Sequence, residues 1–205
     1  MDIRYSFPGW ISRLVRRTIG GDCLEAALGT LNRPLPLYGR VNLAVTSVEG
    51  TVAALQSCGI EAVRRIDMGG CCIEMAGSAG PVAESEVFRR GGLILQDASS
   101  QLVAHFVGAE PGMTVVDFCS APGGKTTALA AAMQLRGTLV ACDVSESRME
   151  RLAENVERLG FSSFIQTFLL DPSGQGMEDL RGLLLEDGAD RVLVDAPCSG
   201  LGTLR

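Results

Sequence analysis

The stretch 114–126 reads TVVDFCSAPGGKT, and it contains the signal that decides the fold. It begins with a short run of β-branched and apolar residues, which is typical of a strand buried on both faces. Two glycines, Gly123 and Gly124, then open an apolar run that continues to Leu135 and predicts a helix. A strand that passes through a glycine turn into a helix is the first half of a unit joining parallel strands through helices.

The same alternation of strand and helix continues through the rest of the chain. The predicted strands span 114–119, 138–143, 164–170 and 191–196, and the predicted helices span 124–135, 145–159 and 177–185. This order predicts an α/β fold with a parallel, doubly wound sheet. The chain ends at Arg205, nine residues after the fourth of these strands. We therefore expect an incomplete sheet, in a domain truncated after its fourth core strand.

The first 91 residues follow another pattern. Apolar residues at helical spacing predict two helices within 10–31, separated at Gly20 and Gly21, and Ser47 is a plausible N-cap for a further helix. That helix is expected over 48–58, and strands are expected over 41–45, 61–65 and 71–75, with a loop over 76–83. Just after residue 91, a strand is expected over 93–95 and a helix over 98–107. We predict a small α+β module over residues 1–91 and a second domain over residues 92–205.

The composition excludes several classes of protein. Hydrophobic residues make up 46% and charged residues 20% of the chain, as in ordinary globular proteins. No apolar run has the length of a membrane helix, and the N-terminus lacks the apolar core of a signal peptide. We expect a soluble cytoplasmic protein with no membrane partner. The net charge of −6 disfavours a strong nucleic-acid binder unless basic surface is clustered or lies outside this chain.

The cysteines and the single histidine argue against several kinds of site and mechanism. The seven cysteines include no C-x-x-C pair, and Cys71 and Cys72 are adjacent, so neither a zinc site nor a disulfide framework is expected. Cys119 and Cys142, near strand ends, are expected to pack rather than react. His105 is the sole histidine, which disfavours a mechanism based on a Ser-His or Cys-His pair. We expect no metal.

Chemistry-bearing residues follow each predicted strand of the second domain, where ligands bind in open parallel sheets. The turn at Gly123 and Gly124 lets a ligand approach the backbone and offers N–H groups to an anion. Asp143 ends the second strand about 20 residues later, where a carboxylate can accept hydrogen bonds from ribose hydroxyls. Asp171 lies just past the third strand, and Asp195 lies at the end of the fourth.

The glycine turn has a competing interpretation as a phosphate-binding P-loop. Residues 124–126, GKT, match the end of the pattern G-x-x-x-x-G-K-[ST], and Asp195 after an apolar strand imitates the magnesium-binding carboxylate. Cys119, however, occupies the position of the required first glycine, and Pro122 stiffens the loop. A nucleotide triphosphatase is therefore the less favoured alternative.

Three segments together resemble the RNA cytosine-C5 methyltransferases: 96–100 (QDASS), 117–126 (DFCSAPGGKT) and 195–200 (DAPCSG). The most similar branch is the bacterial Sun/Fmu (RsmB-type) family acting on small-subunit ribosomal RNA. Residues 8–10 (PGW) and 40–42 (RVN) are similar to the module that precedes the catalytic domain in that family. The resemblance spans nearly the whole chain. It implies a Rossmann-like domain, an RNA-binding role for the first module, and transfer of a methyl group from S-adenosylmethionine to C5 of cytosine in RNA, with ribosomal RNA the expected substrate.

The resemblance also implies a role for individual residues. The implied cofactor contacts are Cys119, Ser120, Ala121, Pro122, Gly123, Gly124, Lys125, Asp143, Arg148, Asp171 and Asp195. Within this set Asp143 matches the ribose ligand and Asp171 the acidic ligand near the adenine, although Leu170 replaces the usual preceding glycine. Asp195 matches the carboxylate near the methionine end and the target base, and is also expected to be catalytic.

Cytosine C5 is a poor nucleophile, and a thiolate that adds to C6 activates it. By resemblance, Cys198 assists product release, whereas the nucleophile belongs to a Thr-Cys motif on the next strand. Because the chain ends before such a strand, no residue here matches that nucleophile. Two alternatives stay open. Either Cys198 itself acts, as the Pro-Cys thiol does in DNA cytosine methyltransferases, or the chain is a non-catalytic fragment that binds S-adenosylmethionine or RNA. We expect a monomer.

Overall fold

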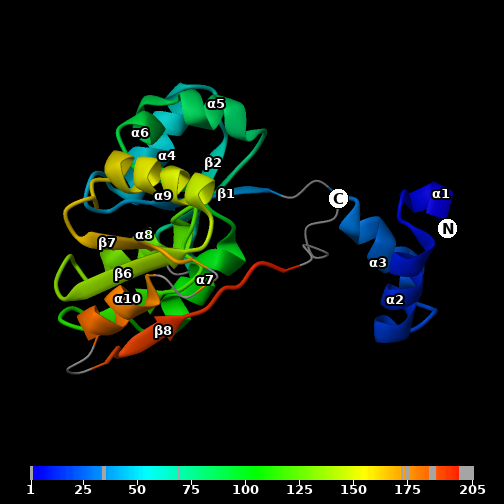
Figure 1. Cartoon of the computed structure of the whole chain (residues 1–205). Helices are drawn as coiled ribbons and strands as arrows, with labels where there is room; N and C mark the ends of the chain where they lie inside the picture. Colours follow the sequence, from blue (N-terminus) through cyan, green and yellow to red (C-terminus); the bar gives the residue numbers. More distant parts are fainter. Residues whose placement is uncertain are drawn as a thin grey trace. The chain divides into compact units, whose positions relative to one another are not determined.

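The structure, a computed structural model, describes residues 2–33, 36–68, 70–171, 173, 176–184 and 188–198. The chain forms two compact units, one of Met1–Leu35 with Pro197–Arg205 and the other of Pro36–Ala196 (Figure 1). None of the helices in the described ranges is both long enough and apolar enough to cross a membrane.

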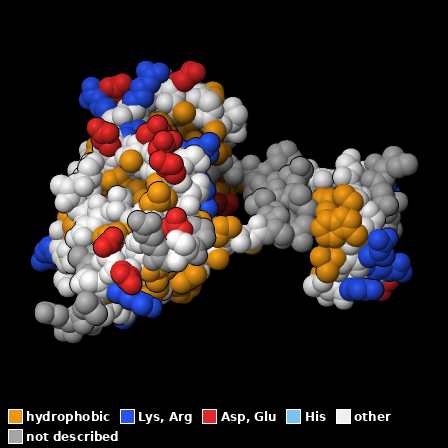
Figure 2. All heavy atoms as spheres, viewed as in Figure 1, with side chains coloured by type: hydrophobic (Ala, Val, Ile, Leu, Met, Phe, Trp, Pro, Cys, Tyr) orange, Lys and Arg blue, Asp and Glu red, His pale blue; other side chains and the backbone are white. Residues whose placement is uncertain are grey.

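The described part of the first unit is helical. Its helices are α1 (Asp2–Tyr5), α2 (Gly9–Ile19) and α3 (Leu24–Leu31). The predicted break between two helices is confirmed, because Gly20 adopts a φ of +86° and its N–H donates to Arg16 O. A small core consists of Phe7, Ile11, Leu24 and Leu28. Trp10 and Leu14 stay exposed, and Figure 2 shows hydrophobic side chains beside basic ones on the surface of this unit.

The second unit begins with an antiparallel sheet of order β2-β3-β1-β4. Its strands are β1 (Leu37–Val41), β2 (Ala62–Arg65), β3 (Cys72–Met75) and β4 (Leu93–Leu95). The associated helices are α4 (Val48–Ser57), the 3-10 turn η1 (Ile66–Met68), α5 (Ala79–Glu84) and α6 (Glu86–Arg89). The predicted cap of α4 is confirmed, because the Ser47 side chain accepts a hydrogen bond from Gly50 N at 3.0 Å.

Two predictions about this part of the chain were wrong. The strand expected over 41–45 lies earlier, at Leu37–Val41, because Asn42 forms a turn: its Oδ1 accepts from Ala44 N at 3.2 Å. The loop expected over 76–83 contains α5. Val82 is fully buried there, so tertiary packing stabilises a helix that a stretch rich in glycine, alanine and proline did not predict.

The second sheet is parallel, with order β7-β6-β5-β8. Its strands are β5 (Thr114–Asp117), β6 (Thr138–Asp143), β7 (Ile165–Leu169) and β8 (Arg191–Leu193). The accompanying helices are α7 (Ala98–Phe106), α8 (Gly124–Ala132), α9 (Glu146–Arg158) and α10 (Met177–Leu184). The last residue of the helix predicted over 177–185 lies outside the described ranges. Val115 packs in the core with α8 and α9, whereas Val116 packs in the core with α10. Helices thus cover both faces, and the predicted α/β fold is confirmed (Figure 1).

The two sheets are joined by contacts across the predicted domain boundary at residue 91. β4 lies beyond that boundary and nevertheless pairs with β1 of the antiparallel sheet. Asn42 Nδ2 donates to Gly91 O and to Leu159 O, at 3.0 Å each. Gly91 has a φ of +76°, and a Cβ there would lie 2.0 Å from Arg158 O. The antiparallel sheet is therefore packed directly onto the end of α9, and the division into two domains stays a prediction.

Candidate functional site

The order of the parallel sheet locates the candidate site. β6 lies on one side of β5 and β8 on the other, so the direction of strand addition reverses at β5. Connections on opposite faces of a sheet leave a crevice at the carboxyl ends of the strands where this reversal occurs, and ligands of open α/β sheets bind in it. The residues after β5, β6 and β8 are the ones that the sequence singled out.

The loop after β5 is held by backbone hydrogen bonds. Ser120 donates to Cys142 O through both its N–H and its hydroxyl, at 2.9 Å each. Gly123 N donates to Ser120 O at 2.8 Å, and Gly123 has a φ of +99°, a conformation that is strained for other residues. The loop therefore turns sharply, and α8 begins at Gly124 with its first N–H groups lacking intrahelical acceptors.

Asp117 ties the end of β5 to the first turn of α8. Its side chain is 1% exposed, and its Oδ2 accepts a hydrogen bond from Thr126 Oγ1 at 2.7 Å. Burial raises the pKa of Asp117 to about 6, and the hydrogen bond from Thr126 opposes this increase. The second carboxylate oxygen, Oδ1, is buried without a hydrogen-bond partner among the described residues.

Asp143 is held in place at the end of β6. It is 2% exposed, and its carboxylate accepts hydrogen bonds from Ala121 N at 3.3 Å and Ser145 N at 3.1 Å. Arg148 of α9 lies 3.3 Å from Asp143 Oδ2 and donates to Ala121 O at 2.6 Å. Arg148 thus connects the carboxylate to the glycine loop, and Asp143 is presented with a fixed orientation.

Lys125 and Asp195 connect α8 to the segment after β8. Lys125 Nζ donates to Asp195 Oδ2 at 2.5 Å, over a separation of 70 residues in sequence. The lysine side chain is 19% exposed and the aspartate side chain 51% exposed. A lysine at the start of a helix is unfavourable in the helix dipole, and the contact with Asp195 offsets that cost.

The remaining predicted residues lie in different surroundings. Asp171 follows β7 and is exposed. Its Oδ1 accepts a hydrogen bond from Ser173 N at 2.6 Å, and hydrogen bonds from Ser173 lower the pKa of Asp171. Cys198 is exposed and belongs to the first compact unit, so its role stays a prediction. Residues 199–200 of the motif lie outside the described ranges.

The thiols beside the crevice are poorly suited to nucleophilic attack. Burial raises the pKa of Cys119, and the nearby carboxylates of Asp143 and Asp117 raise it further. Burial raises the pKa of Cys142 to about 12. Within the described ranges, no group of three or more His, Cys, Asp or Glu side chains is arranged to hold a metal ion.

The sequence did not predict that Arg40, from the antiparallel sheet, is hydrogen-bonded to the glycine loop and α8. Arg40 of β1 donates to Gln96 Oε1 at 2.8 Å, to Thr127 Oγ1 at 2.7 Å and to Gly124 O at 3.2 Å. Only the resemblance of residues 40–42 drew attention to this position. An arginine in a short strand looks like a surface residue, and no local pattern indicates that it is buried.

Comparisons with known proteins agree with this geometry. A family model described as 16S rRNA methyltransferase RsmB/F matches residues 104–205. The probable ribosomal RNA small subunit methyltransferase B of Synechocystis is 34% identical over 203 residues, covering 98% of this chain and 44% of that protein. The human tRNA (cytosine(72)-C(5))-methyltransferase NSUN6 is 40% identical over 116 residues, covering 54% of this chain and 24% of that protein.

A solved structure is similar over nearly the whole chain. The structure of a methyltransferase homologue from Pyrococcus horikoshii matches with a TM-score of 0.80 at 27% identity, covering 99% of this chain and 63% of that one. The chain spans less than half the length of the curated relatives above. The activity of those whole proteins therefore cannot be attributed directly to this chain.

Proposed function

Because this chain belongs to the RsmB/F family of methyltransferases, we propose that it forms the cofactor-binding part of an enzyme that methylates C5 of cytosine in RNA. The observation that carries the proposal is the set of acidic and basic side chains fixed at the crevice beside β5, namely Asp143 with Arg148 and Lys125 with Asp195. Ribosomal RNA is the proposed substrate, since the family model and the Synechocystis relative are both named for it; that substrate implies a cytoplasmic location. The comparisons give no support to the P-loop alternative.

The residues at the crevice fit S-adenosylmethionine. When bound, this cofactor supplies an electrophilic methyl group on its sulfonium sulfur. Asp143, buried and held by three donors, is suited to accept hydrogen bonds from the ribose hydroxyls. The loop 119–125 leads into the N-terminus of α8, whose N–H groups favour an anionic group such as the carboxylate of the cofactor. Asp171 is proposed near the adenine.

Lys125 and Asp195 are proposed to act on the target base. The ammonium group of Lys125 neutralises the charge of the Asp195 carboxylate and fixes its position. Asp195 is still half exposed, so its carboxylate can accept a hydrogen bond from the exocyclic amine of a cytosine. A cytosine must leave its stack to reach such a site, which favours single-stranded RNA or a flipped base. Cys198 is proposed to assist product release.

Isothermal titration calorimetry of the 205-residue chain tests the cofactor assignment. We expect one molecule of S-adenosylmethionine per chain and no binding of ATP with magnesium. ATP binding without S-adenosylmethionine binding would instead favour a nucleotide triphosphatase.

The activity is tested with the protein at the full length that its gene encodes. We expect transfer of labelled methyl groups from S-adenosylmethionine to C5 of cytosine in unmodified small-subunit ribosomal RNA. Asp195→Asn is expected to reduce transfer by at least about 100-fold, as for loss of a positioned charged group. Asp190→Asn is the matched control, because Asp190 lies just before the same strand, β8, and its Oδ2 accepts from Thr114 N. Cofactor binding without transfer would favour a non-catalytic binding protein.

A further inference from the structure

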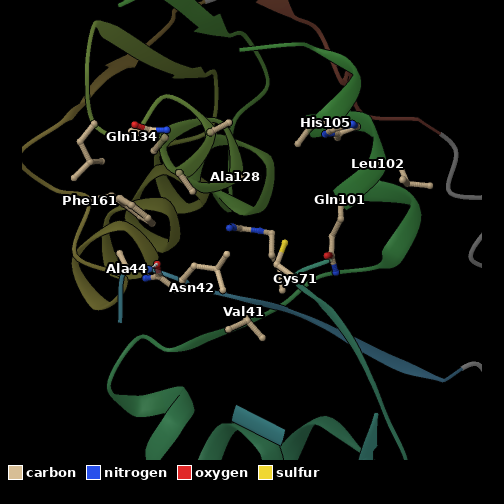
Figure 3. A pocket seen from close by; sticks show the side chains of 17 residues that line it. Val41, Asn42, Ala44, Cys71, Gln101, Leu102, His105, Ala128, Gln134 and Phe161 are labelled. Atoms are coloured by element: carbon tan, nitrogen blue, oxygen red, sulfur yellow. Dashed lines mark hydrogen bonds between the residues drawn. The ribbon is translucent and has the colours of Figure 1, made fainter. Parts of the chain in front are cut away.

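A cavity of about 520 Å³ lies in the second unit, and none of the residues predicted to bind the cofactor lines it. Its walls come from β1, α7 and α8 and from Phe161 (Figure 3). Most of these walls are apolar, as at Val41 and Ala128. Exposed residues, among them His105 and Gln134, also line it, so a ligand can enter from solvent. A volume of this size suits a small organic ligand.

One buried oxygen in the cavity wall has no hydrogen-bond donor. Gln101 of α7 is 6% exposed, and its Nε2 donates to Gln96 O at 3.0 Å. Its Oε1 is buried and has no partner among the described residues. Figure 3 shows the Gln101 side chain reaching from α7 toward Cys71, along the wall of the cavity. A buried acceptor left unpaired is unfavourable, and a ligand with a hydrogen-bond donor would remove that cost.

A buried cation lines the same cavity. Arg40 is 5% exposed, and its hydrogen bonds go from Nε and Nη2 to neutral acceptors. Its Nη1 makes no hydrogen bond to the residues that the structure describes, and none of their carboxylates forms an ion pair with it. Burial lowers the pKa of Arg40 to about 10, so the side chain stays charged near neutral pH. The guanidinium can therefore donate a further hydrogen bond from Nη1, either to water or to a ligand in the cavity.

Arg40 and Gln101 together determine which kind of ligand the cavity can bind. Arg40 and Gln101 are both bonded to Gln96, so a donor and an acceptor are held on one stretch of wall. An apolar carboxylate would satisfy Arg40 but offers no donor to Gln101. The edge of a nucleobase offers both, because a ring carbonyl oxygen or nitrogen lies beside an N–H or amino group. The wall formed by α8 is rich in alanine, whose small side chains leave room for a planar ring.

We propose that this cavity binds one unstacked nucleobase of the RNA substrate, with Arg40 Nη1 donating to a ring acceptor and Gln101 Oε1 accepting from the adjacent N–H or amino group. The proposal rests on the proposed function and adds to it a second base contact, separate from the target cytosine. Single-stranded RNA is read in this way, through bases that leave the stack. Guanine and uracil fit best, since each places a carbonyl oxygen next to a ring N–H.

Titration with mononucleotides tests the proposal. The 205-residue chain is saturated with S-adenosylhomocysteine to block the cofactor site, and GMP, UMP, CMP, AMP and ribose 5-phosphate are added in separate calorimetric titrations. We expect saturable binding of GMP or UMP with a dissociation constant below about 1 mM. Ribose 5-phosphate, which has no base, is expected not to bind. Equal binding of ribose 5-phosphate would mean that the site recognises phosphate alone, and would overturn the proposal.

Two variants assign the binding to the cavity. Ala131→Trp fills the cavity from α8 and is expected to abolish nucleotide binding, whereas Ala153→Trp makes the same change on an exposed position of α9 outside it. Gln101→Leu is expected to weaken binding about tenfold through loss of the acceptor. S-adenosylmethionine binding should be unchanged in both tryptophan variants. Nucleotide binding that survives Ala131→Trp, or no nucleotide binding by a chain that still binds S-adenosylmethionine, refutes the cavity assignment and leaves the proposed function intact.

Discussion

Asp117 makes the stability of the second unit depend on pH in an unusual direction. Its carboxylate is buried at the end of β5, and burial raises its pKa from 3.8 to about 6. The folded chain therefore binds this proton more tightly than the unfolded chain does. The contribution of Asp117 to the free energy of unfolding is highest below pH 4 and falls as the pH rises through 6. At 1.36 kcal/mol per pKa unit, the total decrease is about 3 kcal/mol.

The substitution Asp117→Asn isolates this contribution. Asparagine cannot ionise, and its side-chain oxygen can still accept the hydrogen bond from Thr126 Oγ1. We expect the free energy of unfolding of the variant, relative to the original chain, to increase by about 2.5 kcal/mol between pH 4 and pH 7. Urea unfolding, followed by circular dichroism at one-unit pH intervals without ligand, measures this difference.

A second variant gives a matched comparison. Thr126→Val removes the hydrogen bond that stabilises the charged form of Asp117, so it should raise the pKa of Asp117 further. The loss of stability with increasing pH should then be larger and extend to higher pH. A difference between Asp117→Asn and the original chain that is constant from pH 4 to pH 7, or that decreases, would refute this account of the buried carboxylate.

Three further substitutions, the first with a matched control, test other parts of the structure. Gly91→Ala places a Cβ 2.0 Å from Arg158 O and should lower the free energy of unfolding by more than about 3 kcal/mol in urea unfolding. The control, Gly108→Ala, is also at positive φ but has no atom within 4 Å of the new Cβ, so it should cost about 1 kcal/mol. Equal losses in the two variants would argue against the close contact at Gly91. Ser47→Ala removes the N-cap of α4 and should cost about 1 kcal/mol; an unchanged urea midpoint would argue that the cap is unimportant. Asp143→Asn should weaken S-adenosylmethionine binding at least about tenfold by calorimetry, and unchanged affinity would remove this residue from the cofactor site.

Local patterns predicted most of the parallel half of the molecule. The strand over 138–143 and the starts of the helices at Gly124 and Met177 match the structure, because apolar strands covered on both faces and glycine turns leave a signal in neighbouring residues. The ends of strands and helices were less well predicted. The strand expected to reach Ala196 ends at Leu193, because Leu193 pairs with Asp117, the last residue of β5.

The antiparallel half was harder to predict from sequence. The strand that contains Arg40 was displaced by several residues, because a turn centred on Asn42 interrupts an apolar run that otherwise resembles a strand. α5 was missed because the burial of Val82 outweighs the weak helix propensity of its neighbours.

By itself, the sequence determined the alternating order of strands and helices, the glycine turn, and the acidic residues that follow each strand. These features depend on residues close together along the chain. Only the tertiary structure decided that Arg40 bonds to Gly124, 84 residues away, that Lys125 meets Asp195, and that a cavity with unpaired polar atoms lies beside α8. Such contacts depend on how distant segments pack, and a buried arginine has the same local sequence signal as an exposed one.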